Sequence, residues 1–344
     1  MRMLLAGVVA AALGVGVSGP APTAVDIARQ TGSTRVVAAV PSPGHPAYVH
    51  AHTNGRIYVG TYKSGDGQAS RVIEYSGRGT LLRSWTVPGQ RLAADPGVQA
   101  ANQTADGDLV LLETSRRAVM TLDLRTGRFR TVATLPPGAV PNYATWTPFG
   151  LLVSDYAQGV LWRVGRGGAV SAWYRSPALE GVAGFGTTGL VYRARERDLL
   201  ITQQTVSDGS DLPTNGALYR LTLDGDRPGR LRTLWRSAPT DLPDGFGVGR
   251  SGRIYIANAG LTNQIVVLSP TGQELRRLPE LPGTGENGSP IPFDTPCSAT
   301  FRGTEILVAN QSAILGDASH MAVLAVEVGE RGRTPYLPRT ARFR

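Results

Sequence analysis

The chain is poor in cysteine and lysine and has few long apolar runs, and each shortage excludes a class of protein. Cys297 is the only cysteine in 344 residues, so no internal disulfide can stabilise the fold, and paired-cysteine metal sites are excluded. We expect Cys297 to be a buried, inert thiol. Beyond residue 17 no apolar run is long enough for a membrane-spanning helix. Packing and strand pairing must therefore hold the fold together.

The charge balance is basic, but the basic residues are scattered. The formal net charge is +9, and because Lys63 is the only lysine, nearly all of the positive charge comes from arginine. The arginines lie in turns and in expected outer strands, as at Arg193, Arg195 and Arg197, rather than in one cluster. This scatter is typical of solvated faces and argues against a nucleic-acid partner.

The first residues have the pattern of an export signal. Met1-Arg2-Met3 gives a short basic start, and residues 4–17 are all apolar or small. Small residues follow as far as Ala24. This pattern predicts a signal peptide over residues 1–24, with an uncleaved anchor as the alternative. We expect the folded part to be secreted, periplasmic or on the cell surface, with no membrane contact beyond the signal.

One pattern occurs six times along the chain: a short apolar strand that follows a glycine or a charged turn. The starts of these strands lie roughly 43 to 55 residues apart, close to the spacing of propeller blades. The strands are expected at residues 55–61, 107–113, 150–156, 197–203, 252–258 and 304–310. A single strand of this kind cannot bury both faces, whereas several blades around an axis can.

Each repeat has another short strand before it and a hairpin after it, the last hairpin being expected at residues 321–337. Four strands per repeat predict an all-β fold, a six-bladed β-propeller with four antiparallel strands in each blade. The propeller is expected to form a single domain over residues 41–340. Residues 25–40 are expected to be a tail that can add an outer strand to the last blade and close the ring.

Polar residues at the starts of the innermost strands are the candidates for a functional site. In a propeller these strands line the central channel, so the residues at their starts converge on one mouth of it. His45, Asn142, Thr188, Asp244 and Asp294 occupy or adjoin such positions. Asp244 lies in Pro-Asp-Gly, which also suits a turn with no chemical role.

Two repeats resemble a known family. Residues 242–258 (LPDGFGVGRSGRIYIAN) are similar to the "PDG…D.dG.lyvA" blade of the SMP-30/gluconolactonase/strictosidine-synthase-like propellers. Residues 141–164 (PNYATWTPFGLLVSDYAQGVLWRV) are similar to the "PND…G.lyvtD…g.iwrv" blade of the same family. With the repeat pattern, the resemblance extends over residues 37–338.

The resemblance implies a divalent cation, often calcium, at the channel mouth. By matching motif, Asp244 would be the fifth-blade carboxylate ligand and Asn142 the third-blade amide ligand. Thr188 stands where the family has an asparagine, and the first-blade glutamate is missing at Gly44-His45-Pro46. Asp294 could add a second carboxylate, and His45 would favour a transition metal; the family implies neither of these.

These observations leave three functions open. The first is an exported, metal-dependent lactonase in which Asn142 and Asp244 hold the cation and Asp244 or Asp294 assists proton transfer. The second is a non-catalytic propeller that binds a small ligand, glycan or protein at the same mouth, which the loss of two family ligands favours. The third is a metal-independent condensing enzyme, for which Glu180 is the candidate glutamate. A small-molecule partner and a monomer are expected.

Overall fold

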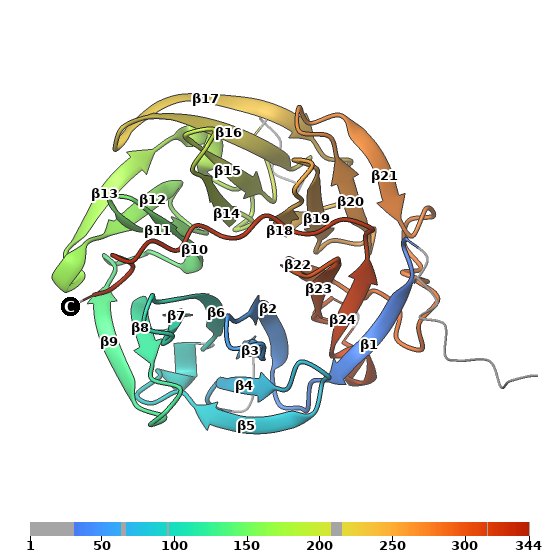
Figure 1. The fold of residues 1–344 in the computed structure, drawn as a ribbon, viewed down its shortest axis with the longest axis horizontal. Helices are drawn as coiled ribbons and strands as arrows, with labels where there is room; N and C mark the ends of the chain where they lie inside the picture. The colour runs from blue at the N-terminus through green and yellow to red at the C-terminus, as the bar shows by residue number, and fades with distance from the viewer. Residues whose placement is uncertain (1–30, 63–66, 95, 208–214, 315, 344) are drawn as a thin grey trace, which may run out of the picture.

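Six four-stranded antiparallel sheets surround a central channel in the computed structural model, which describes residues 31–62, 67–94, 96–207, 215–314 and 316–343. Figure 1, viewed down the ring, shows the sheets following one another in chain order around the axis. The prediction of an all-β, six-bladed propeller with four strands per blade is confirmed. The predicted signal peptide lies outside the described residues.

Each sheet runs from an inner strand at the channel to an outer strand at the rim. The first three sheets are β2 (His45–Ala51), β3 (Ile57–Tyr62), β4 (Arg71–Tyr75), β5 (Leu81–Thr86); β6 (Val98–Gln103), β7 (Leu109–Glu113), β8 (Ala118–Leu122), β9 (Phe129–Thr134); and β10 (Pro141–Thr147), β11 (Gly150–Asp155), β12 (Val160–Val164), β13 (Val170–Arg175).

The fourth and fifth sheets are β14 (Thr187–Arg193), β15 (Asp198–Gln203), β16 (Ala217–Asp224), β17 (Arg227–Arg236); and β18 (Pro243–Val248), β19 (Ile254–Asn258), β20 (Ile265–Leu268), β21 (Glu274–Leu278). The sixth is β22 (Pro296–Arg302), β23 (Glu305–Asn310), β24 (Ala322–Glu327) and β1 (Thr34–Ala39). The short 3-10 turns are η1 (Leu92–Ala94), η2 (Arg166–Gly168), η3 (Pro177–Leu179) and η4 (Ala318–His320).

Apolar side chains between adjacent sheets form the core. Between the first two sheets, for example, Tyr58 and Val72 pack against Val98 and Leu111, and all four are fully buried. Burial of both faces explains why the middle strands are almost continuously apolar. The sheets also approach closely at Gly60, where a Cβ atom would lie 1.9 Å from the Val98 carbonyl oxygen.

The first and last parts of the described chain meet in the sixth sheet. Strand β1 pairs with β24 as its outer strand, so the N-terminal segment closes the ring. The hairpin expected at residues 321–337 is not formed: only β24 comes from this region, because β1 takes the outer position. The chain after β24 therefore does not belong to the sixth sheet.

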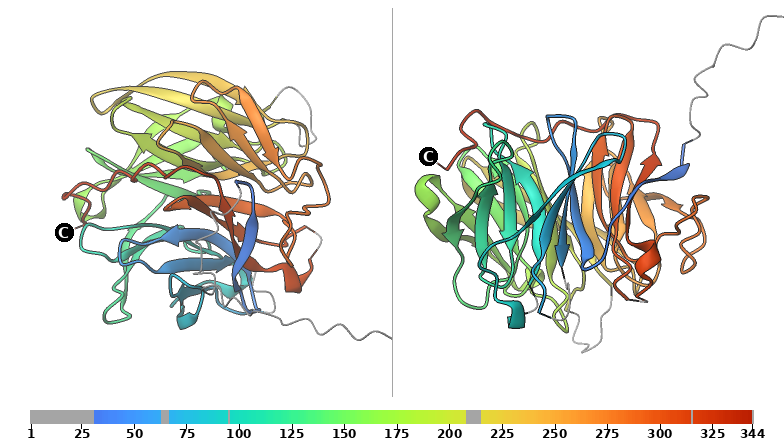
Figure 2. Two further views of the ribbon diagram at one scale, coloured as in Figure 1. Left: turned by 45° about the vertical axis from the view of Figure 1, so that its right-hand side comes forward. Right: turned by 90° about the horizontal axis from the view of Figure 1, so that it is seen from below.

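Residues 328–343, which we call the C-terminal strap, cross one face of the ring from the sixth sheet to the second and third (Figures 1 and 2). The far end is anchored in the core, where Phe343 is 4% exposed and its ring centroid lies 5.1 Å from that of Trp146. Gly332 forms an isolated bridge with Gly249, the residue after β18. The strap is thus part of the packed structure.

Among the described residues no helix is long and apolar enough to cross a membrane.

Candidate functional site: two ends of the axial channel

Irregular register at the starts of the inner strands turns selected side chains toward the channel. In β10 the pairing with β11 shifts between Pro141 and Ala144, and in β18 the pairing with β19 shifts between Pro243 and Phe246. In β2 a shift between Ala47 and Val49 leaves Tyr48 outside the ladder. Such bulges re-aim side chains, and here they bring residues from three blades together.

Asn142 and Asp244 meet at the hydroxyl of Tyr48. The Tyr48 oxygen lies 2.5 Å from Asp244 Oδ1 and 2.9 Å from Asn142 Oδ1. Tyr48 is 3% exposed, and its ring centroid lies 4.7 Å from that of Tyr143. Gly245 leaves room for the ring, since a Cβ atom there would lie 2.7 Å from Tyr48 Cε1. The Tyr48 side chain therefore occupies the space between the two residues that the resemblance implied as cation ligands.

Burial favours the protonated form of Asp244. The Tyr48 hydroxyl lies within donating distance of both Asp244 Oδ1 and Asn142 Oδ1. Burial raises the pKa of Asp244 to about 7, although hydrogen bonds from Tyr48, the Gly245 N–H and Gln204 oppose the rise. Desolvation therefore outweighs these bonds and keeps the proton on this carboxyl group toward the neutral range.

A polar chain extends outward from Asp244. Gln204 Nε2 donates to Asp244 Oδ2 at 3.2 Å, and Tyr156 donates from its hydroxyl to Gln204 Oε1 at 2.5 Å. No sequence pattern marked Gln204 or Tyr156 as a site residue. Gln204 directly follows β15 and so lies at the same end of the fourth blade as the start of β14, which is the signal that could have marked it.

The other predicted site residues bond elsewhere. Thr188 Oγ1 lies 3.0 Å from the Pro243 carbonyl oxygen and 3.1 Å from Thr202 Oγ1. His45 Nδ1 lies 2.9 Å from the Gln311 carbonyl oxygen. Their polar atoms stabilise neighbouring backbone and loops rather than joining Asn142 and Asp244.

Asp294 belongs to a separate network in the sixth blade. Its Oδ2 accepts from Ser312 at 2.8 Å and lies 2.9 Å from His320 Nδ1. Asp294 is 4% exposed. Since a buried carboxylate with such partners orders the loops that it joins, this arrangement accounts for Asp294 without a catalytic role.

The residues at the mouth do not fit a calcium ion. Calcium takes six to eight oxygen ligands, and its affinity rises with their charge. Here one carboxylate and one amide both bond to the Tyr48 hydroxyl. Within the described part of the chain, no group of three or more His, Cys, Asp or Glu could hold a metal ion. Gln99 Oε1, near the start of β6, is buried without a hydrogen-bond partner. With a single carboxylate at the mouth, however, the donor set still carries too little charge for a calcium site.

A cavity of about 720 Å³ lies at the opposite end of the channel, toward the ends of the inner strands. Each of the six inner strands contributes to its lining, through His50, Asn102, Tyr143, Tyr192, Phe246 and Thr300. The C-terminal strap adds Arg333, Thr334, Pro335 and Tyr336. We call this space the axial cavity. Tyr143, which contacts the Tyr48 ring, also lines it, so the mouth and the axial cavity share a layer of aromatic side chains.

The histidines and Cys297 are accounted for by the fold. His50 Nε2 lies 3.3 Å from Gln103 Oε1, and burial is the main cause that lowers the pKa of His50 to about 4. His52 Nε2 lies 3.0 Å from the Gly107 carbonyl oxygen. Cys297 is fully buried, and burial raises the pKa of its thiol, which confirms the expectation of an inert cysteine.

Comparison with known proteins finds its matches among solved structures. No protein-family profile and no curated protein sequence matches the chain. A structural-genomics protein provisionally assigned as a gluconolactonase shares the fold with a TM-score of 0.59 at 16% identity, covering 87% of this chain and 93% of its own. A gluconolactonase from Xanthomonas campestris gives 0.52 at 16% identity, covering 88% and 99%.

Virginiamycin B lyase from Staphylococcus aureus, solved with quinupristin, has a TM-score of 0.55 at 15% identity, covering 84% of this chain and 82% of its own. The architecture is that of the gluconolactonases and streptogramin lyases. The resemblance read from residues 141–164 and 242–258 is thus confirmed at the level of the fold.

Proposed function

We propose that this protein is an exported propeller that binds a small organic molecule in the axial cavity. The observation that carries the proposal is the cavity itself. Its volume, about 720 Å³, lies within the range of roughly 300–1,000 Å³ typical of small-molecule sites. All six blades and the strap contribute to its lining, so a bound molecule would contact every part of the ring.

The proposal moves the binding site away from the mouth that the sequence favoured. Tyr48 fills the space between Asn142 and Asp244, and its hydroxyl bonds to both. The axial cavity lies beyond Tyr143 and Phe246, at the other end of the channel. Support for binding therefore comes from a region to which the sequence analysis assigned no site.

Export and a monomeric state remain part of the proposal. Their support is the basic and apolar pattern of residues 1–24 and a ring that is closed by the chain's own strand β1. Small-molecule binding is in keeping with the structural neighbours, since one of them was solved with quinupristin. These neighbours are distant in sequence, so the cavity is the main support.

The test is a titration with N-phenyl-1-naphthylamine, a neutral probe whose fluorescence rises in apolar sites. We expect saturable binding of one probe per chain. Replacing Tyr192 and Tyr336 together by alanine should weaken binding about tenfold, because two ring contacts are lost. The matched control is Trp173→Ala, which removes an aromatic ring from the outer strand β13. No saturable binding, or equal binding by the double tyrosine variant, would contradict the proposal.

Lactone hydrolysis at the mouth is the second candidate, and one observation favours it. Asn142 and Asp244, far apart in the sequence, meet at one hydroxyl, and the pKa of Asp244 is raised to about 7, which suits a general acid–base group. The assay is glucono-1,5-lactone hydrolysis with calcium or a chelator. Turnover that Asp244→Asn abolishes would support this candidate; turnover no faster than the buffer blank would remove it.

A further inference from the structure

We infer that the axial cavity takes an amphipathic organic anion, with an apolar or aromatic body inside the ring and its negative group at the strap-side rim. This inference rests on the proposed binding function and names the chemistry of the ligand. Two independent features of the lining support it: the balance of charge and the aromatic walls.

Two of the four arginines that line the cavity are neutralised by carboxylates. Arg193 forms a buried double contact with Asp198, at 2.7 Å from each of two nitrogens. Arg333, on the strap, pairs with Glu196 at 2.5 Å. These two pairs hold the lining and the strap in place, and they add little net charge to the cavity.

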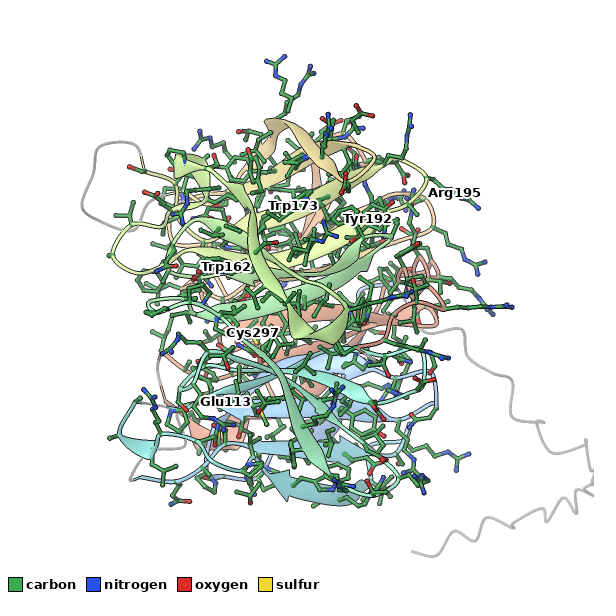
Figure 3. All side chains as sticks on the ribbon, turned by 90° about the vertical axis from the view of Figure 1, so that its left-hand side faces the viewer. Glu113, Trp162, Trp173, Tyr192, Arg195 and Cys297 are labelled. Carbon is green, nitrogen blue, oxygen red and sulfur yellow. The ribbon has the colours of Figure 1, made fainter. Side chains whose placement is uncertain are left out.

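The other two arginines keep their charge. Arg195 and Arg250 line the cavity and are exposed, and neither side chain has an ion-pair or hydrogen-bond partner among the described residues. Figure 3 shows Arg195 projecting outward beyond Tyr192. The charges of Arg193 and Arg333 are balanced by Asp198 and Glu196. The rim therefore carries two unpaired positive charges and no unpaired negative charge among the described residues. A site with this balance attracts anions, and guanidinium groups bind carboxylate, sulfonate or phosphate in two-point contacts.

Part of the cavity wall is aromatic, beside polar residues such as His50, Asn102 and Thr300. The rings of Tyr192 and Tyr336 meet edge-on at 5.0 Å, one from the fourth blade and one from the strap. Phe246 and Tyr143 lie deeper, toward the mouth. Such walls favour a ligand whose aromatic or aliphatic body can pack against the rings over a simple inorganic anion, which has no such body.

One acceptor atom in the lining has no partner. Glu196 uses Oε1 to hold Arg333, whereas Oε2 is buried and has no hydrogen-bond partner among the described residues. That oxygen has no open surface toward the cavity, so it gives no contact point to a ligand. The ligand class therefore depends on the charge at the rim and on the aromatic walls.

Two probes that differ in one charged group test the inference. 8-Anilinonaphthalene-1-sulfonate has an aromatic body, an N–H donor and a sulfonate; N-phenyl-1-naphthylamine has the same body and donor without the sulfonate. We expect the wild-type protein to bind the sulfonate probe about tenfold more tightly. The double variant Arg195→Gln/Arg250→Gln should lose that advantage while binding the neutral probe within about twofold of wild type.

The matched control is Arg230→Gln/Arg232→Gln, which removes two exposed arginines from the outer strand β17 and lowers the net charge equally. It should leave both affinities unchanged. Equal binding of the two probes, or equal loss of sulfonate affinity in both double variants, would overturn the anion inference while the binding function stands. Failure of both probes to bind would overturn the function and the inference together.

Discussion

The two ends of the channel are built from the same six inner strands, but they differ in charge. At the mouth, the Tyr48 hydroxyl bonds to Asn142 and Asp244 within the protein. At the rim of the axial cavity, Arg195 and Arg250 keep positive charge without a partner among the described residues. Buried atoms without a partner occur at the mouth end too, at Gln99 Oε1 and in the Asn258 side chain, so they do not distinguish the two ends. The free charge at the rim is the feature that indicates a ligand.

Removing the Tyr48 side chain, which lies between Asn142 and Asp244 at the mouth, is expected to have the largest effect on stability. Tyr48→Ala deletes a buried ring and leaves Asp244 and Asn142 without their partner, so we expect a loss of about 4 kcal/mol in the free energy of unfolding. Denaturant unfolding measures it. Tyr192→Ala, at the half-buried cavity wall, should cost about 1 kcal/mol. Similar costs for the two variants would show that the two ends do not differ as described.

Loosening the strap should affect the cavity end alone. Phe343 is 4% exposed and anchors the strap beside Trp146. Phe343→Ala should cost about 3 kcal/mol, and it should also speed release of the neutral naphthylamine probe, because the strap lines the cavity. Stopped-flow release and denaturant unfolding measure the two effects. Arg339→Ala, an exposed change on the same strap, is the control; an unchanged release rate in Phe343→Ala would contradict the lining role of the strap.

The sequence carried more information about the ring than about its chemistry. Blade spacing and turn glycines are local patterns, so they predicted six sheets and the strands within them. In the sixth blade, the outer strand expected from residues 25–40 is present as β1, and the hairpin also expected at residues 321–337 was wrong. Asn142 and Asp244 were found by motif, but the meaning of the pair depends on Tyr48, whose approach depends on a register shift in β2 and on space at Gly245. No local pattern encodes that contact.

The axial cavity could not be predicted for the same physical reason. Its lining joins the ends of six strands with a strap that was expected to form a hairpin at residues 321–337. The free charge at its rim depends on which arginines find carboxylates: Arg193 does and Arg195 does not, although they lie two residues apart. Pairing of this kind is a property of the folded surface.

The two ends should respond to pH in opposite directions. Asp244 has a folded pKa of about 7 against an ordinary value of 3.8, so its contribution to stability is present at low pH and is lost as the pH rises through 7. His50 has a folded pKa of about 4 against 6.5, so its contribution is present above 6.5 and is lost as the pH falls toward 4.

The contribution is about 4 kcal/mol for Asp244 and about 3 kcal/mol for His50, and unfolding from pH 4 to pH 8 separates them. The stability of Asp244→Asn relative to wild type should rise across this range, and that of His50→Gln should fall. Slopes of the same sign in both variants would contradict the assignment.

Calcium is expected to have the smallest effect on stability. Its effect distinguishes the two ends most directly, because only the mouth was predicted to bind a cation. A cation held by Asn142 and Asp244 at a hundred times its dissociation constant would stabilise the fold by about 2.7 kcal/mol. Because the Tyr48 hydroxyl already bonds to both residues, neither calcium nor a chelator should shift the melting temperature. Asn142→Ala is the control, since a true calcium site would lose its response in that variant. If calcium raises the melting temperature of the wild-type protein and Asn142→Ala abolishes that rise, Tyr48 must move aside when calcium binds. The mouth would then be a cation site.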